Sequence, residues 1–79
     1  MDEYLGVIKL FPVTHIPKGY LKCDGQFLSI DEHQALFSIL ANNFGGDGKD
    51  FFSLPDLRRA SPHQHLAYAV CVEGNYPMP

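Results

Sequence analysis

The chain has 79 residues, a formal net charge of −3 and 46% hydrophobic residues, without any tryptophan. A chain of this length forms one small domain, here residues 1–79, whose core only marginally offsets the entropy of folding. Self-association, a metal or a disulfide would add stability. The basic residues form no cluster beyond the pair Arg58-Arg59, which excludes nucleic acid as the main partner because a phosphate backbone is bound by grouped basic side chains.

The N-terminal segment predicts a strand rather than a targeting signal. Its sequence, MDEYLGVIKLF, carries acids where a signal peptide has basic residues, and Lys9 interrupts the short apolar run. We therefore expect no signal peptide and no membrane insertion. Residues 4–11 are rich in β-branched and aromatic side chains and end at Pro12, which is typical of a strand.

A hairpin is predicted around Asp24-Gly25. The apolar segments 20–23 and 26–30 flank this dipeptide, which is a frequent two-residue turn. We therefore expect these two segments to pair with each other.

A helix is predicted over about residues 30–42. Ser29 and Glu32 fit the capping box S-x-x-E, in which each side chain bonds a backbone N–H of the first helical turn. Leu36, Phe37 and Leu40 follow at helical spacing, and Asn42, Asn43 and the glycines after them are helix-stop signals.

Residues 66–73 have the clearest strand pattern, because large and small side chains alternate along LAYAVCVE. The alanines on one face indicate close packing there, so this strand should be central and covered on both sides. Together the elements predict an α+β fold: a small compact domain with a few short antiparallel strands, one helix and a long glycine- and proline-rich loop region.

Cys23 and Cys71 lie far apart in the sequence, which fits neither a C-x-x-C redox motif nor a zinc ribbon. We expect buried free thiols. The alternative is a disulfide, which would require an oxidising compartment.

The loop FGGDGKD is predicted to be scaffold. A phosphate-binding loop needs Ser or Thr after its Gly-Lys pair, but Asp50 follows Lys49, and the EF-hand spacing of acids is absent as well. Weak calcium binding by Asp47 and Asp50 is the alternative, although acids beside glycines usually bond their own backbone amides. Side chains of Phe44, Phe51 or Phe52, and Leu54 are expected to enter the core.

His63-Gln64-His65 is a candidate metal site. At strand spacing both imidazoles would project from one face and could share one metal ion. Three chains around a threefold axis would complete an octahedral cage suited to iron or another transition metal, such as zinc. The alternative is a pair of solvated histidines in the loop after Pro62.

The sequence predicts no enzyme. None of the serines lies in a G-x-S-x-G setting, and no pair of carboxylates stands out as an acid/base couple. No catalytic residue is therefore predicted.

The motifs, taken in order, resemble the phage tail collar domain, which occurs in short tail fibres and in microcystin-dependent-type proteins. The resemblance covers nearly the whole chain and is specific in the spacing of three blocks. The residues of these blocks are Cys23, Asp24, Gly25 and Gln26; Phe44, Gly45, Gly46, Asp47 and Gly48; and Leu54, Pro55, Asp56 and Leu57 followed by Arg58. Two differences stand out: Arg59 occupies a position where the family usually has glycine, and only ASPHQH joins the last block to the final strand, where longer relatives have a further segment.

The resemblance implies a structural or attachment protein of phage tails or tail-like particles that forms homo-oligomers, often trimers, or docks on a tail or host-surface protein. By analogy it favours metal binding at an oligomer axis through His63 and His65, and Arg58 and Arg59 are candidates for partner contact. The expected location is the virion or a tail-like particle. The alternative is a stand-alone binding protein for a small ligand or a host factor, with a regulatory or anti-defence role in the bacterial cytoplasm.

Overall fold

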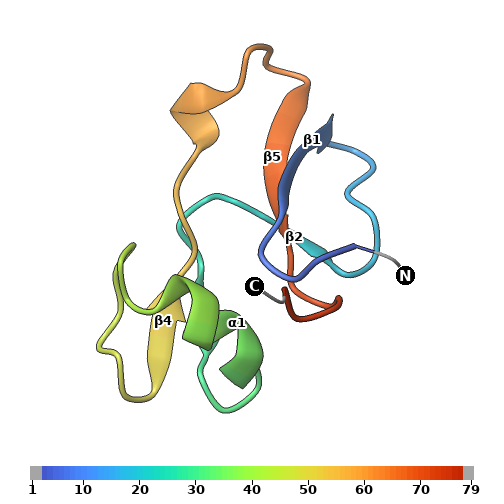
Figure 1. Cartoon of the computed structure of the whole chain (residues 1–79). Helices are drawn as coiled ribbons and strands as arrows, with labels where there is room; N and C mark the ends of the chain where they lie inside the picture. The colour runs from blue at the N-terminus through green and yellow to red at the C-terminus, as the bar shows by residue number, and fades with distance from the viewer. Residues whose placement is uncertain (1–2, 78–79) are drawn as a thin grey trace.

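The strands are divided between two antiparallel sheets that lie at opposite ends of the molecule, with the helix beside the smaller one (Figure 1). The structure, a computed structural model, describes residues 3–77. In chain order the elements are β1 (Ile8–Pro12), β2 (Tyr20–Lys22), β3 (Phe27–Ser29), α1 (Gln34–Leu40), β4 (Phe51–Ser53), the 3₁₀ helix η1 (Arg58–Ala60) and β5 (Leu66–Cys71). The predicted α+β class is confirmed.

The larger sheet has the order β1-β5-β2, so β5 is its central strand, as its sequence predicts. One face of β5 packs Ala69 and Cys71 against Tyr20, and the other face places Val70 in the main core. Ala69, Val70 and Cys71 are all 0% exposed. The alanines allow this burial because a larger side chain would hold the covering residues away.

β1 is shorter than the predicted strand, because Gly6 adopts a left-handed φ of 90° that interrupts extended backbone. Pro12 nevertheless belongs to the strand and lies opposite Leu66. The missing N–H of Pro12 removes no hydrogen bond between β1 and β5, because its position points away from β5. The next N–H that points toward β5, that of Val13, donates to the carbonyl of His65 at 3.0 Å.

The predicted hairpin around Asp24-Gly25 is wrong. β2 pairs with β5, whereas β3 pairs with β4 in the other sheet. The two flanking segments are bound to distant partners, since the amide of Cys23 donates to Tyr68 at 2.9 Å and the carbonyl of Gln26 accepts from Leu54 at 2.9 Å. Asp24-Gly25 therefore carries the chain from one sheet to the other, with Gly25 at a φ of 81°.

The helix is also shorter than predicted, and its predicted cap does not form. Ser29 ends β3 opposite Phe51, and residues 30–32 form a turn before α1 begins at Gln34. The residue before the helix is His33, which makes no side-chain capping bond. Although its local sequence pattern indicates a cap, Ser29 does not cap the helix, because it is paired with Phe51 in the sheet. At the other end Ala41 turns left-handed at a φ of 51°, and its N–H donates to the carbonyl of Phe37 at 2.6 Å.

The main core lies between the sheets and the helix. Its largest buried side chains are those of Phe52, Leu36, Leu54 and Val70, each at most 1% exposed. Phe52 and Leu54 were expected there, but the expectation for Phe44 is wrong, because its side chain is 51% exposed.

Both cysteines are buried free thiols, so the predicted state is confirmed and the disulfide alternative is wrong. Cys23 lies in the main core and Cys71 in the smaller cluster on the opposite face of β5. Burial raises the pKa of the Cys23 thiol to about 11. Within residues 3–77 the structure has no helix that is both long and apolar enough to cross a membrane.

We predict that Gly46→Ala destabilises the protein far more than Gly48→Ala. Both glycines have left-handed φ angles, 97° and 72°, so alanine strains the backbone at either position. A Cβ at Gly46 would also lie 2.5 Å from Cα of Phe52, whereas at Gly48 the nearest atom is the movable amide of Asn42 at 3.2 Å. Urea unfolding should show a loss of about 3 kcal/mol or more for the first variant and about 1 kcal/mol for the second. Equal losses would contradict the close approach of Gly46 to β4.

Candidate functional site

The glycine loop is held by one carboxylate. Oδ1 of Asp47 accepts hydrogen bonds from the backbone N–H groups of Lys49, Asp50 and Phe51 at 2.8, 2.9 and 3.2 Å. These bonds hold the pKa of Asp47 below its ordinary value, because they stabilise the charged form. The carboxylate is thus used to fix the loop, as the scaffold interpretation predicts.

A backbone joint connects the two sheets. We use the term CDGQ–LPDL joint for residues 23–26 and 54–57. These two segments run antiparallel and form an isolated β-bridge between Asp24 and Asp56. The N–H of Leu57 donates to the carbonyl of Cys23 at 2.8 Å, and the N–H of Gly25 donates to that of Pro55 at 3.3 Å. The two sequence blocks, about thirty residues apart, are therefore one structural unit.

Arg58 is paired with Asp56. Nε and Nη2 of Arg58 donate to the two carboxylate oxygens at 2.9 and 2.6 Å. This forked contact lowers the pKa of Asp56 to about 2. Arg59 is exposed and has no ion pair among the described residues. It lies in η1 with a negative φ, which explains why this position does not require glycine.

The structure places His63 and His65 in a turn directly before β5, not in the strand, which begins at Leu66. The geometric basis of the predicted shared metal, two rings on one strand face, is therefore wrong. The rings still lie at the same tip, with centroids 5.2 Å apart and planes tilted by 38°.

A hydrogen bond from the backbone sets the tautomer of the His63 ring. The N–H of His65 donates to Nδ1 of His63 at 3.1 Å, so a neutral His63 carries its proton on Nε2. Among residues 3–77 there is no group of three or more His, Cys, Asp or Glu side chains placed to hold a metal ion. A metal at this tip therefore requires ligands from further copies or partners.

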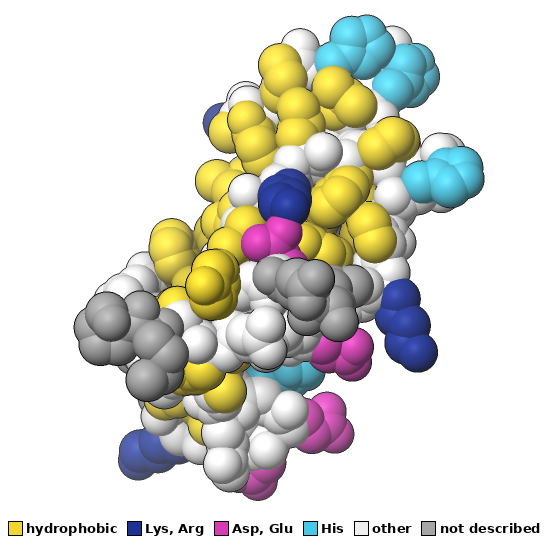
Figure 2. Space-filling view, turned by 45° about the vertical axis from the view of Figure 1, so that its right-hand side comes forward, with side chains coloured by type: hydrophobic (Ala, Val, Ile, Leu, Met, Phe, Trp, Pro, Cys, Tyr) yellow, Lys and Arg dark blue, Asp and Glu magenta, His cyan; other side chains and the backbone are white. Residues whose placement is uncertain are grey.

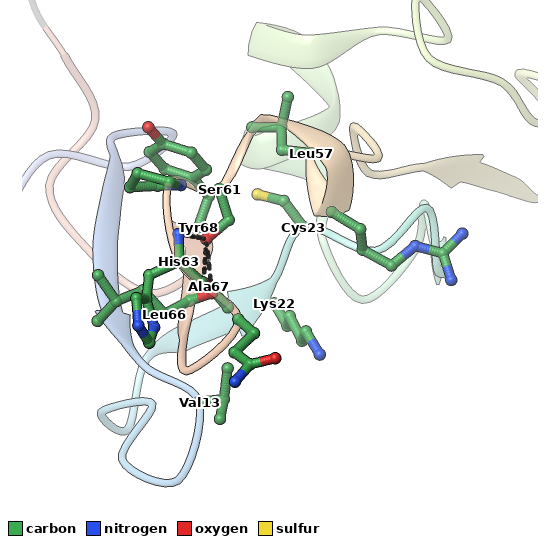
Figure 3. A pocket seen from close by; sticks show the side chains of 12 residues that line it. Val13, Lys22, Cys23, Leu57, Ser61, His63, Leu66, Ala67 and Tyr68 are labelled. Atoms are coloured by element: carbon green, nitrogen blue, oxygen red, sulfur yellow. Dashed lines mark hydrogen bonds between the residues drawn. The ribbon is translucent and has the colours of Figure 1, made fainter.

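A groove of about 400 Å³ opens next to the histidine turn, between the turn, η1 and the larger sheet (Figure 3). Leu57, Leu66, Ala67 and Tyr68 provide apolar walls, and Lys22 and Gln64 add polar groups. The hydroxyl of Ser61 is shared between the carbonyls of His63 and Leu66 at 2.9 and 2.7 Å, which fixes the turn against the start of β5. Sequence reasoning missed this groove because its residues come from four separate segments of the chain.

Comparison with protein families gives one match. A family model described as Phage Tail Collar Domain matches residues 6–62. Neither the curated proteins nor the solved structures give a match. The matched range includes the joint and the glycine loop and ends one residue before His63, so the histidine turn and β5 lie outside it.

Proposed function

Because the chain belongs to the phage tail collar domain family, we propose that it is a non-enzymatic structural or attachment protein of a phage tail or tail-like particle, and that it acts by self-association or by docking on a tail or host-surface protein. The family match supports the structural role. The surface of β1 supports association.

The outer edge of β1 has backbone groups without a hydrogen-bond partner among residues 3–77. Val13 donates to His65 at 3.0 Å and Val7 accepts from Cys71 at 2.8 Å, so odd-numbered residues of this segment face β5. The amides and carbonyls of Ile8 and Leu10 therefore point away from the sheet. An open edge of this kind is a template for pairing with another chain.

Several side chains of this segment are apolar and exposed, and the charged side chain between them, Lys9, pairs with Glu3. Ile8, Leu10 and Val13 are 39%, 37% and 37% exposed. Figure 2 shows apolar side chains spread over the half of the molecule that carries most of the histidines, with acidic side chains only in the middle and at the other end of this face. An apolar area beside open backbone groups is the observation that best supports association through β1.

We predict that the protein is an oligomer in solution, with three copies as the expected count, and that Leu10→Glu converts it to a monomer. A buried contact would place the new charge in an apolar interface, which is strongly unfavourable. Light scattering after size exclusion measures the mass directly. Phe27→Glu is the matched control, because Phe27 is 63% exposed on the other sheet and should leave the oligomer intact.

A strict monomer that also captures no tail or host-surface protein would contradict this function. If the oligomer persists in Leu10→Glu but is lost in Phe27→Glu, the interface lies on the smaller sheet and association through β1 is wrong.

Arg58 and Arg59 remain candidates for partner contact. The carboxylate of Asp56 neutralises Arg58, so Arg59 is the side chain of the two that is available for an acidic partner. This difference favours Arg59 as the contact residue.

We also propose that His63 and His65 bind a transition metal, iron or zinc, when several copies meet at the histidine turn. Support comes from the exposure of both rings and from their separation of 5.2 Å. The histidine turn lies outside the matched family range, so the family match itself does not bear on this metal site.

The predicted result is a metal content of roughly one ion per three chains in protein purified without chelator or affinity tag, measured by elemental analysis. The double variant His63→Ala, His65→Ala should lose the metal, whereas His33→Ala, a histidine before α1, should keep it. Metal-free wild-type protein, together with an unchanged oligomer in the double variant, would refute this proposal.

The second candidate function is a stand-alone binding protein for a small ligand or host factor, located in the cytoplasm of the bacterial host. The groove beside the histidine turn is the observation that favours it.

A further inference from the structure

We infer that the groove binds an amphipathic carboxylate, meaning a molecule with an apolar body and one anionic head group. The inference rests on the second candidate function, for which it names the class of ligand.

The apolar part of the ligand is defined by the groove walls. Leu57 lies on one side, and Leu66, Ala67 and Tyr68 of β5 lie on the other (Figure 3). A volume of about 400 Å³ is within the range of small-molecule sites, which are mostly apolar with a few polar groups that set orientation. The walls favour an aryl or alkyl body over a sugar or a nucleotide.

The charge of the lining defines the head group. Lys22 and Arg58 line the groove together with His63, whereas no carboxylate of residues 3–77 does, although the chain as a whole has a net charge of −3. Asp56 already pairs with Arg58. Lys22 has no ion pair within residues 3–77, so its ammonium is free to pair with a ligand. One free cation matches a singly charged carboxylate better than a phosphate, which is usually held by several donors.

The other polar groups of the groove favour binding over reaction. The Ser61 hydroxyl is engaged by two backbone carbonyls. The Cys23 thiol has its pKa raised to about 11, so at neutral pH it is neither a thiolate nor a competing negative charge. Neither residue is set up as a nucleophile.

The groove is also preformed. Leu57 is held in place because its N–H donates to the carbonyl of Cys23 at 2.8 Å. Cys23 is in turn held against β5, because its own N–H donates to the carbonyl of Tyr68 at 2.9 Å. A rigid site loses little conformational entropy on binding.

A matched pair of probes tests the inference: 4-phenylbutyrate and its neutral amide, 4-phenylbutyramide, titrated into ¹⁵N-labelled protein of full length. The carboxylate should shift amide signals of Leu57, Gln64 and Ala67, and its affinity should exceed that of the amide by roughly two- to fivefold at low salt, as for an exposed ion pair. Lys22→Gln should remove this preference, whereas Lys49→Gln, a change in the glycine loop, should preserve it.

The outcomes separate the ligand class from the binding function. If both probes bind the groove equally and Lys22→Gln changes nothing, the groove binds ligands but the anionic class is wrong. If neither probe shifts groove amides, the inference is overturned, and the second candidate function would stand only for a host factor. Shifts confined to the exposed phenylalanines of the smaller sheet would place the binding surface elsewhere and overturn the inference as well.

Discussion

The structure depends on the antiparallel backbone contact between residues 23–26 and 54–57. The smaller sheet has only two strands and is too small to be stable alone, and the core face of the larger sheet at Val70 is covered by side chains of the smaller sheet and the helix. The CDGQ–LPDL joint connects them, because Cys23 bonds Tyr68 in the larger sheet while Gln26 bonds Leu54 next to the smaller one. The same contact places Leu57 and Arg58 beside β5 and so forms one wall of the groove. The sequence blocks that identify the family therefore serve the architecture.

Features that depend on near neighbours could be predicted from the sequence. The alternation in β5 and the amide bonds of Asp47 are both local, and each was predicted correctly. The hairpin at Asp24-Gly25 and the cap at Ser29 were equally plausible local patterns. They failed because distant strands compete for the same backbone groups: β5 binds the segment before Asp24, and β4 binds Ser29. The groove could not be predicted, since it exists only after four segments have been brought together.

The sequence blocks shared with the family serve the fold, whereas the surfaces proposed for contact lie around β5; of these surfaces, only the histidine turn and β5 itself lie outside the matched range 6–62. Residues 6–62 include the joint and the glycine loop, whose carboxylates are bound to the chain itself. The free edge of β1 and the groove lie around β5, and the histidine turn directly precedes it. We therefore assign the scaffold role to the shared blocks and look for specific contacts near β5. The shared blocks would keep the fold constant, and differences in the side chains near β5 would determine which partner or ligand is bound.

Native-state hydrogen exchange tests the claim that the joint makes both sheets one cooperative unit. The amides of Cys23, Leu54 and Leu57 all donate within or next to the joint. If the joint unites the two sheets, these amides exchange only through global unfolding, with the same free energy of opening as the amide of Val70 in the buried central strand. Exchange of the joint amides through a local opening of lower free energy, while Val70 stays protected, would contradict this and show that the two sheets are separate cooperative units.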